Sequence, residues 1–266
     1  MPLIELKNIS FSYLQSSQSS NFSLEGINLI INKGDFISIL GPNGCGKSTL
    51  LKLIARLLNP QDGHILFSDV EYQKIPRKNF TKKIAYVPQT TYSIYPFSVF
   101  EVVMMGRTPY LNLLGFESGE DIDIVEETLE KVGILNLRHK GINEISGGEA
   151  QRAFIARALV QTPEIILLDE PNAHLDIEHQ MEIFNLLNFL NKNEKLTVVA
   201  VSHDLNLVGL FSERALLMKS GKIILDSDKK SILTESNIKE IFNVNSIVRY
   251  NQDSDSLLVN IIPNPH

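Results

Sequence analysis

The fold of this 266-residue chain is decided by the stretch Gly41-Pro42-Asn43-Gly44-Cys45-Gly46-Lys47-Ser48-Thr49. It follows the apolar run 36–40 and precedes the helix-like run 50–58. Strand, glycine loop and helix are the context in which a G-x-x-x-x-G-K-[ST] pattern indicates a phosphate-binding loop. Glycines let backbone N–H groups turn toward phosphate oxygens, and the helix N-terminus adds positive potential. The alternative, a glycine turn with a chance lysine, does not account for this context.

The loop predicts a nucleoside triphosphate site with distinct roles for its side chains. We expect Lys47 to place its charge on the β- and γ-phosphates and Ser48 to offer a hydroxyl to Mg²⁺. Cys45 needs to supply only its backbone amide. The residues expected to bind the nucleotide in this loop are Asn43, Gly44, Cys45, Gly46, Lys47, Ser48 and Thr49.

Composition limits the other classes of function. The chain is 43% hydrophobic and 21% charged, as in ordinary globular proteins. Its net charge of -6 argues against a nucleic-acid partner, because phosphate contacts need clustered Lys and Arg. One cysteine excludes an internal disulfide and a cysteine-based metal cage. No apolar run is long enough to span a bilayer, so we expect a cytoplasmic protein that could sit on a membrane partner.

Hydrophobic periodicity outlines the domain organisation. Alternating residues predict strands at 3–11, 24–31 and 63–67, and short apolar runs predict strands at 84–87, 165–168, 197–201, 215–218 and 222–225. A helical pattern occupies about 98–159, where Ile122, Val125, Leu129 and Val132 form an apolar stripe. Another helix follows 165–168. The pattern predicts an α/β core with an inserted helical subdomain, followed by a small tail from about 231.

Two carboxylates end the buried run Ile165-Ile166-Leu167-Leu168-Asp169-Glu170. Asp169 can orient Mg²⁺ through water, and Glu170 can polarise an attacking water as general base. Two acids at a strand end are also common on plain surfaces. Together with the phosphate loop they favour nucleotide hydrolysis.

A second anion-binding surface is predicted at Ile145-Ser146-Gly147-Gly148-Glu149, which opens a helix. Ser146 is typical of an N-cap, and the two glycines leave amides accessible at the positive end of the helix. The alternative is an ordinary capped helix that follows a turn.

With these motifs in this order, the sequence resembles the nucleotide-binding subunit of ATP-binding cassette (ABC) transporters over roughly residues 3–230. Residues 41–49 resemble its Walker A loop, 165–170 its Walker B strand, and 145–149 its signature. The resemblance implies that Gln89 senses Mg²⁺, water and the membrane partner, that His203 contacts the γ-phosphate, and that Tyr13 stacks on adenine. Asp176, in the D-loop, would communicate across a dimer.

The resemblance also implies the architecture: a P-loop NTPase (RecA-like) α/β core with an antiparallel β subdomain and an inserted α-helical subdomain. The ATPase domain would cover 1–240, with the core at 1–90 and 160–230 and the helical subdomain at about 91–159. Residues 231–266 would form a small tail packed on the core. Glu149 replaces the usual Gln and Ile145 the usual Leu, and Asn172-Ala173 replaces Thr-Ser. None of these changes removes a catalytic group.

In this family two copies pack head to tail, and each ATP lies between one chain's phosphate loop and the partner's signature. The resemblance therefore implies a dimer, most simply a homodimer, in which Ser146, Gly147, Gly148 and Glu149 face the partner's ATP. ATP closes the dimer, and hydrolysis through Glu170 opens it.

Two segments resemble the subgroup that serves importers of iron-siderophores, haem and vitamin B12. They are 102–110, which contains the sequence Gly-Arg-Thr-Pro-Tyr, and the tail 232–244. This implies transmembrane permease subunits, an extracytoplasmic substrate-binding protein that acts indirectly, and a peripheral location at the cytoplasmic face of the membrane. The ATPase of a different ABC transporter and a soluble non-transport ABC ATPase are the alternatives. An apolar stretch from Tyr92 to Tyr110 is expected to contribute a groove for a permease helix.

Overall fold

The chain divides into two compact units in the computed structural model, which describes residues 2–13, 23–89, 95–111, 116–173 and 175–263. The first unit combines Met1–Lys74 with Thr197–His266, and the second is Ile75–Leu196. The phosphate loop therefore belongs to the first unit, and the acidic strand end and the signature-like helix belong to the second.

The first unit contains an antiparallel sheet with the strand order β2-β1-β4-β5. Its strands are β1 (Pro2–Ser12), β2 (Ser23–Asn32), β4 (Asp62–Phe67) and β5 (Val70–Glu71). Buried and exposed residues alternate along β2, as expected for a sheet with one face on the core. The strands predicted at 3–11, 24–31 and 63–67 are confirmed.

A second set of strands in this unit carries the phosphate loop. It consists of β3 (Phe36–Leu40), β8 (Thr197–Val201), β9 (Arg214–Lys219) and β10 (Lys222–Asp228). Strand β3 pairs in parallel with both β8 and β9, and β10 pairs antiparallel with β9. Every residue of β3 and β8 is buried, which explains their continuous apolar runs. Helix α1 (Lys47–Ile54) begins within the last three residues of the loop.

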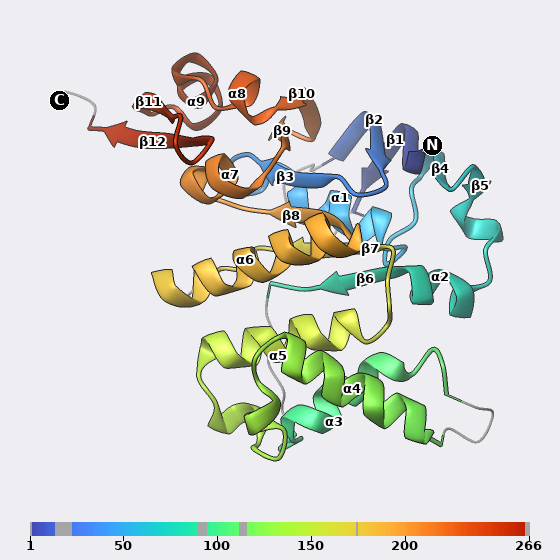
Figure 1. Ribbon diagram of the computed structural model, residues 1–266. Helices are drawn as coiled ribbons and strands as arrows, with labels where there is room; N and C mark the ends of the chain where they lie inside the picture. The colour runs from blue at the N-terminus through green and yellow to red at the C-terminus, as the bar shows by residue number, and fades with distance from the viewer. Residues whose placement is uncertain (1, 14–22, 90–94, 112–115, 174, 264–266) are drawn as a thin grey trace. The chain divides into compact units, whose positions relative to one another are not determined.

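The end of the chain folds onto the same unit. It contains α7 (Leu205–Phe211), α8 (Lys229–Ile232), α9 (Glu235–Phe242), β11 (Asn245–Asn251) and β12 (Ser256–Ile262). Strands β11 and β12 form an antiparallel hairpin near α7 and α9 (Figure 1). Leu40, Val208 and Leu257 share one core cluster. The sequence predicted a small tail here but not the hairpin.

The second unit has a pair of parallel strands, β6 (Ile84–Val87) and β7 (Ile165–Asp169). Helix α2 (Arg77–Lys83) runs directly into β6, and α6 (Ile177–Glu194) follows β7. All five residues of β7 are buried, so the strand delivers its final carboxylate from a rigid support.

Three further helices of the second unit pack together (Figure 1). They are α3 (Val99–Met104), α4 (Gly119–Lys131) and α5 (Gly147–Leu159). The predicted stripe on α4 is confirmed at Val125 and Leu129, which are fully buried, but Ile122 is 41% exposed. No helix within the described residues is long and apolar enough to cross a membrane. These elements agree with the predicted α/β class, its antiparallel sheet and its helical block, while the predicted domain boundaries stay a prediction.

Candidate functional site

The phosphate loop is shaped by glycines with positive φ. Gly41, Gly44 and Gly46 have φ of 154°, 76° and 109°, values that L side chains rarely adopt. A Cβ on Gly41 would lie 2.3 Å from the carbonyl oxygen of Met218 in β9, so this position also lacks space. Gly46 is the N-cap of α1 and makes no side-chain cap hydrogen bond.

The lysine of the loop is held inside it. Lys47 is 5% exposed, and its Nζ donates to the carbonyl oxygens of Gly41 at 2.9 Å and Pro42 at 3.1 Å. The backbone N–H of Gly221, in the β9–β10 turn, donates to the carbonyl oxygen of Cys45 at 3.1 Å. The cation is therefore fixed among loop carbonyls, and the turn braces the loop from outside.

The cysteine of the loop is a packing residue in this structure. Cys45 is 3% exposed, and burial raises the pKa of its thiol although the Lys47 cation opposes the shift. A thiol with these properties is a weak nucleophile. This agrees with the expectation that only its amide matters.

Two more candidate residues lie in the first unit. Tyr13 follows β1; its ring is half-exposed, stacks edge-on against Phe11 at a centroid distance of 5.0 Å, and its hydroxyl lies 3.3 Å from the hydroxyl of Thr49. This contact places an exposed aromatic ring beside the start of α1. His203 is exposed and follows the buried Ser202. The next residue, Asp204, is half-buried and its side chain caps α7.

In the second unit the structure brings Gln89 and Glu170 together. Gln89 Nε2 donates to Glu170 Oε2 at 2.7 Å, and the hydroxyl of Tyr86 donates to Asp169 Oδ2 at 3.2 Å. Asp169 is 4% exposed. Glu170 has a φ of 51°, a left-handed conformation that is strained for a non-glycine residue and is often found at functional sites. No pattern in the sequence marks Tyr86 as a partner of this pair.

The signature-like segment begins α5 with a capping box. Ser146 Oγ accepts from the backbone N–H of Glu149 at 3.3 Å, and Glu149 Oε2 accepts from the backbone N–H of Ser146 at 2.8 Å. The backbone N–H of Ser146, followed by its side chain, lowers the pKa of Glu149. The Glu in place of Gln is therefore an ionised cap of its own helix. Gly147 is exposed and Gly148 is buried.

The D-loop segment lies between β7 and α6, and His174 within it is outside the described residues. Asp176 caps α6: its Oδ1 accepts from the backbone N–H of His179 at 2.9 Å and contacts His179 Nδ1 at 2.6 Å. The backbone N–H of His179, then its ring, lowers the pKa of Asp176. His179 was not among the predicted site residues, because a histidine in the first turn of a helix carries no distinguishing pattern.

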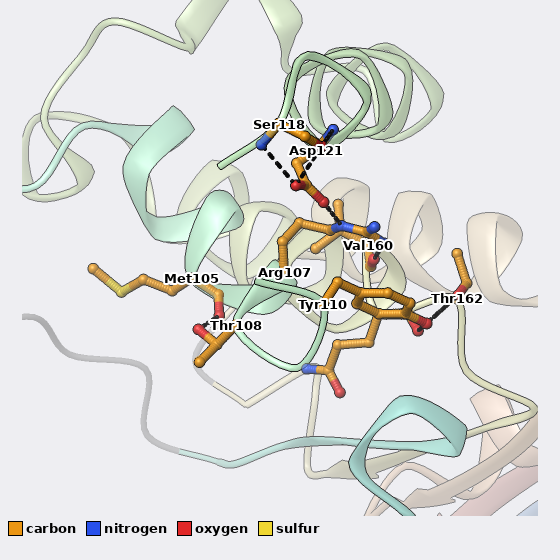
Figure 2. Close-up of polar contacts among 9 residues, drawn as sticks. Met105, Arg107, Thr108, Tyr110, Ser118, Asp121, Val160 and Thr162 are labelled. Carbon is orange, nitrogen blue, oxygen red and sulfur yellow. Dashed lines mark hydrogen bonds and ion pairs between the residues drawn. The ribbon is translucent and has the colours of Figure 1, made fainter. Parts of the chain in front are cut away.

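The Gly-Arg-Thr-Pro-Tyr segment is an internal brace. Figure 2 shows Arg107 between Asp121, Val160 and Tyr110. Arg107 Nε donates to Asp121 Oδ1 at 2.8 Å, Nη1 donates to the carbonyl oxygen of Val160 at 2.8 Å, and the guanidinium carbon lies 3.8 Å from the centroid of the Tyr110 ring. A Cβ on Gly106 would lie 2.1 Å from the carbonyl oxygen of Arg157. Packing within the second unit therefore accounts for Gly106, Arg107 and Tyr110 of this segment.

Much of the apolar stretch expected to form a permease groove is core. Val102, Val103 and Met104 are buried, whereas Tyr95 is 65% exposed. Tyr92 lies outside the described residues. The groove stays a prediction.

Comparisons with known proteins agree with these motifs. The model of the ABC transporter family matches residues 24–173. A probable siderophore transport system ATP-binding protein of Bacillus subtilis is 37% identical over 222 residues, which cover 84% of this chain and 81% of the relative. A transporter described as of the metal-chelate ABC type, in an inward-facing conformation, has a TM-score of 0.85 and 29% identity, covering 100% of this chain and 98% of that one. A dimeric ATP-binding cassette in a post-hydrolysis state, bound to ADP and Pi, has a TM-score of 0.74 and 32% identity. The match covers 85% of this chain and 98% of that one.

Proposed function

This chain belongs to the ABC transporter family, and we propose from that premise that it energises the import of a metal chelate. It is an ATP-binding subunit and an ATPase, as in this family. The chelate assignment is supported by the siderophore relative and by the metal-chelate type structure. The Gly-Arg-Thr-Pro-Tyr segment points to the same subgroup. Haem and cobalamin types are alternatives that a transport assay separates.

We assign nucleotide binding to the first unit. Tyr13 stacks on the base, and the amides of the phosphate loop from Asn43 to Thr49 bind phosphate oxygens. Lys47, already held at the loop carbonyls, neutralises the β- and γ-phosphates. His203, which is exposed two residues after β8, contacts the γ-phosphate.

Magnesium fits the donor chemistry of the proposed residues. Mg²⁺ prefers oxygen ligands and usually keeps several waters, so it needs only one or two protein groups besides the phosphates. The Ser48 hydroxyl, the Asp169 carboxylate and the Gln89 side-chain oxygen are such groups. The ion would neutralise charge on the β- and γ-phosphates.

Hydrolysis is assigned to Glu170, and its contact with Gln89 is the observation that carries this proposal. A carboxylate that accepts a hydrogen bond at 2.7 Å is held in one orientation, as a general base must be. The buried Asp169 beside it is fixed by Tyr86. Proton transfer from an attacking water to Glu170 would then accompany cleavage of the γ-phosphate.

One chain offers one phosphate loop and one signature segment, so two copies are needed to complete a site. We infer that Ser146, Gly147, Gly148 and Glu149 of one copy close over the ATP held by the other, with Asp176 at the contact. The dimeric relative with ADP and Pi supports this arrangement. ATP stabilises the closed dimer only as far as it binds that state better than the open one.

The same proposal places the dimer on transmembrane permease subunits at the cytoplasmic face of the membrane. An extracytoplasmic substrate-binding protein would act through the permease. Copurification with a permease and ATP-dependent uptake of a ferric hydroxamate into vesicles would test this part. Uptake of haem or cobalamin instead would reassign the chelate class.

The test of the ATPase assignment is Glu170→Gln. Removing a general base lowers kcat by about 10²–10⁴-fold, and the variant should accumulate as an ATP-bound dimer in analytical ultracentrifugation. Glu178→Gln, at an exposed carboxylate in the first turn of α6, is the matched control and should keep wild-type turnover. Near-normal hydrolysis by Glu170→Gln would refute the base assignment.

A further inference from the structure

A histidine at the start of α6 connects two segments that serve different ATP molecules. His179 lies in the first turn of α6, with 25% of its side chain exposed. Its Nδ1 lies 2.6 Å from Asp176 Oδ1. Because a carboxylate oxygen can only accept, Nδ1 carries the proton in this contact. The Asp176 side chain is 66% exposed, so it can also make a contact outside the chain.

The other side of the imidazole ring covers the signature segment of the same unit. A Cβ placed on Gly148 would lie 1.8 Å from His179 Cδ2, 2.3 Å from Cγ and 2.7 Å from Nε2. The ring therefore occupies the space that any side chain at position 148 would need. The backbone at Gly148, near the start of α5, rests on the histidine of α6.

The neighbouring residue fixes the D-loop to the same turn of α6. Gln180 Nε2 donates to the carbonyl oxygen of Leu175 at 2.9 Å and to that of Asn172 at 3.3 Å. The backbone N–H of Ala173 donates to the carbonyl oxygen of Glu170 at 3.1 Å. A series of contacts therefore runs from the backbone carbonyl of Glu170 through the D-loop to Gln180. The neighbouring His179 extends it to the signature glycine.

We propose that His179 is a positioning residue that fixes the signature backbone at Gly148 relative to the D-loop at Asp176. This inference rests on the proposed dimer, in which Glu170 acts on the ATP of its own chain and the signature segment closes over the ATP of the partner. Through His179, a change at the chain's own ATP site would shift the signature segment that contacts the ATP of the partner.

Single substitutions separate the two contacts of His179. His179→Ala removes both the hydrogen bond and the ring. His179→Asn keeps a donor near the place of Nδ1 but removes most of the ring, and His179→Phe keeps a ring but no donor. His139→Ala, at an exposed histidine of the second unit, is the matched control.

The experiment measures ATP-dependent dimerisation of the full chain in the Glu170→Gln background by analytical ultracentrifugation, with ATP as the probe. We expect His179→Ala to raise the dimer dissociation constant by about tenfold, which corresponds to about 1.4 kcal/mol. The Asn and Phe variants should fall between the Ala variant and the parent. The affinity of the protomer for ATP, measured at a dilution without dimers, should stay unchanged, as should the melting temperature.

Several results would overturn the inference. One is an Ala variant that dimerises like its parent; another is an Asn variant as weak as the Ala variant. A third is a parallel loss of ATP affinity and melting temperature, which would reveal a merely structural role. A Glu170→Gln parent that stays monomeric in ATP would instead refute the proposed dimer itself, and this inference with it.

Discussion

Replacing Arg107 by Leu should destabilise the second unit strongly, because the side chain is the centre of a buried brace. The guanidinium and the Asp121 carboxylate are only 5% and 8% exposed. Removing one partner of a buried ion pair typically costs about 3–5 kcal/mol, since it leaves the other charge uncompensated. Asp121 would keep its bonds from the backbone N–H of Ser118 at 2.9 Å and the Ser118 hydroxyl at 2.7 Å. We therefore expect Arg107→Leu to lower the free energy of unfolding by about 3 kcal/mol, the lower end of this range.

The same brace makes stability depend on pH in the acid range. The Ser118 hydroxyl, then its backbone N–H and Arg107, lower the pKa of Asp121 from the ordinary 3.8 to about 2. Because the folded pKa is the lower one, this stabilisation is present above about pH 4 and is lost as the pH falls toward about 2. Its size is on the order of 2 kcal/mol. Asp121→Asn should abolish this part of the acid dependence.

Urea unfolding of the full chain, followed by circular dichroism, measures both effects. The matched control is Lys131→Met, since Lys131 pairs with Glu194 at the same distance of 2.8 Å but both side chains are more than 40% exposed. An exposed pair contributes at most about 1 kcal/mol. If Arg107→Leu cost no more than Lys131→Met, the reasoning from burial would be refuted.

Two further substitutions test the first unit. Lys47→Ala should weaken ATP binding by tenfold or more, a change of at least about 1.4 kcal/mol, as measured by equilibrium dialysis; unchanged binding would contradict the phosphate-loop assignment. Gly209→Ala should lower the free energy of unfolding by about 1–3 kcal/mol, because its Cβ would lie 2.2 Å from the carbonyl oxygen of Leu257. A thermal melt of Gly209→Ala that overlays the wild type would show that β12 can move away from α7.

Much of the fold was predictable because its signals are local. The loop requires glycine at positions 41 and 46 because the backbone has a positive φ there. A fully buried strand such as β3 or β7 requires a continuous apolar run. Asp169 and Glu170 were predicted as site residues because they end such a run. The order of residues along the chain was therefore enough to predict these elements, without knowledge of contacts between distant residues.

The features that were missed depend on contacts between distant residues. The hairpin β11–β12 is rich in polar residues, and its pairing is supported by side chains from elsewhere. Asn206 Oδ1 accepts from the backbone N–H of Val259 at 2.7 Å, and Glu235 Oε1 accepts from that of Val248 at 3.2 Å. The contact of His179 with Gly148 likewise joins different helices. No local sequence pattern predicts such contacts.

The left-handed backbone of Glu170 implies a conflict between durability and activity at this position. Conformations of this kind cost about 1–3 kcal/mol, and glycine or asparagine adopts them more readily than glutamate. A chain selected only for resistance to heat would be expected to replace Glu170 by Gly or Asn and would lose the proposed hydrolytic base. Under this proposal, the glutamate accepts a loss of folding stability that ATP hydrolysis requires.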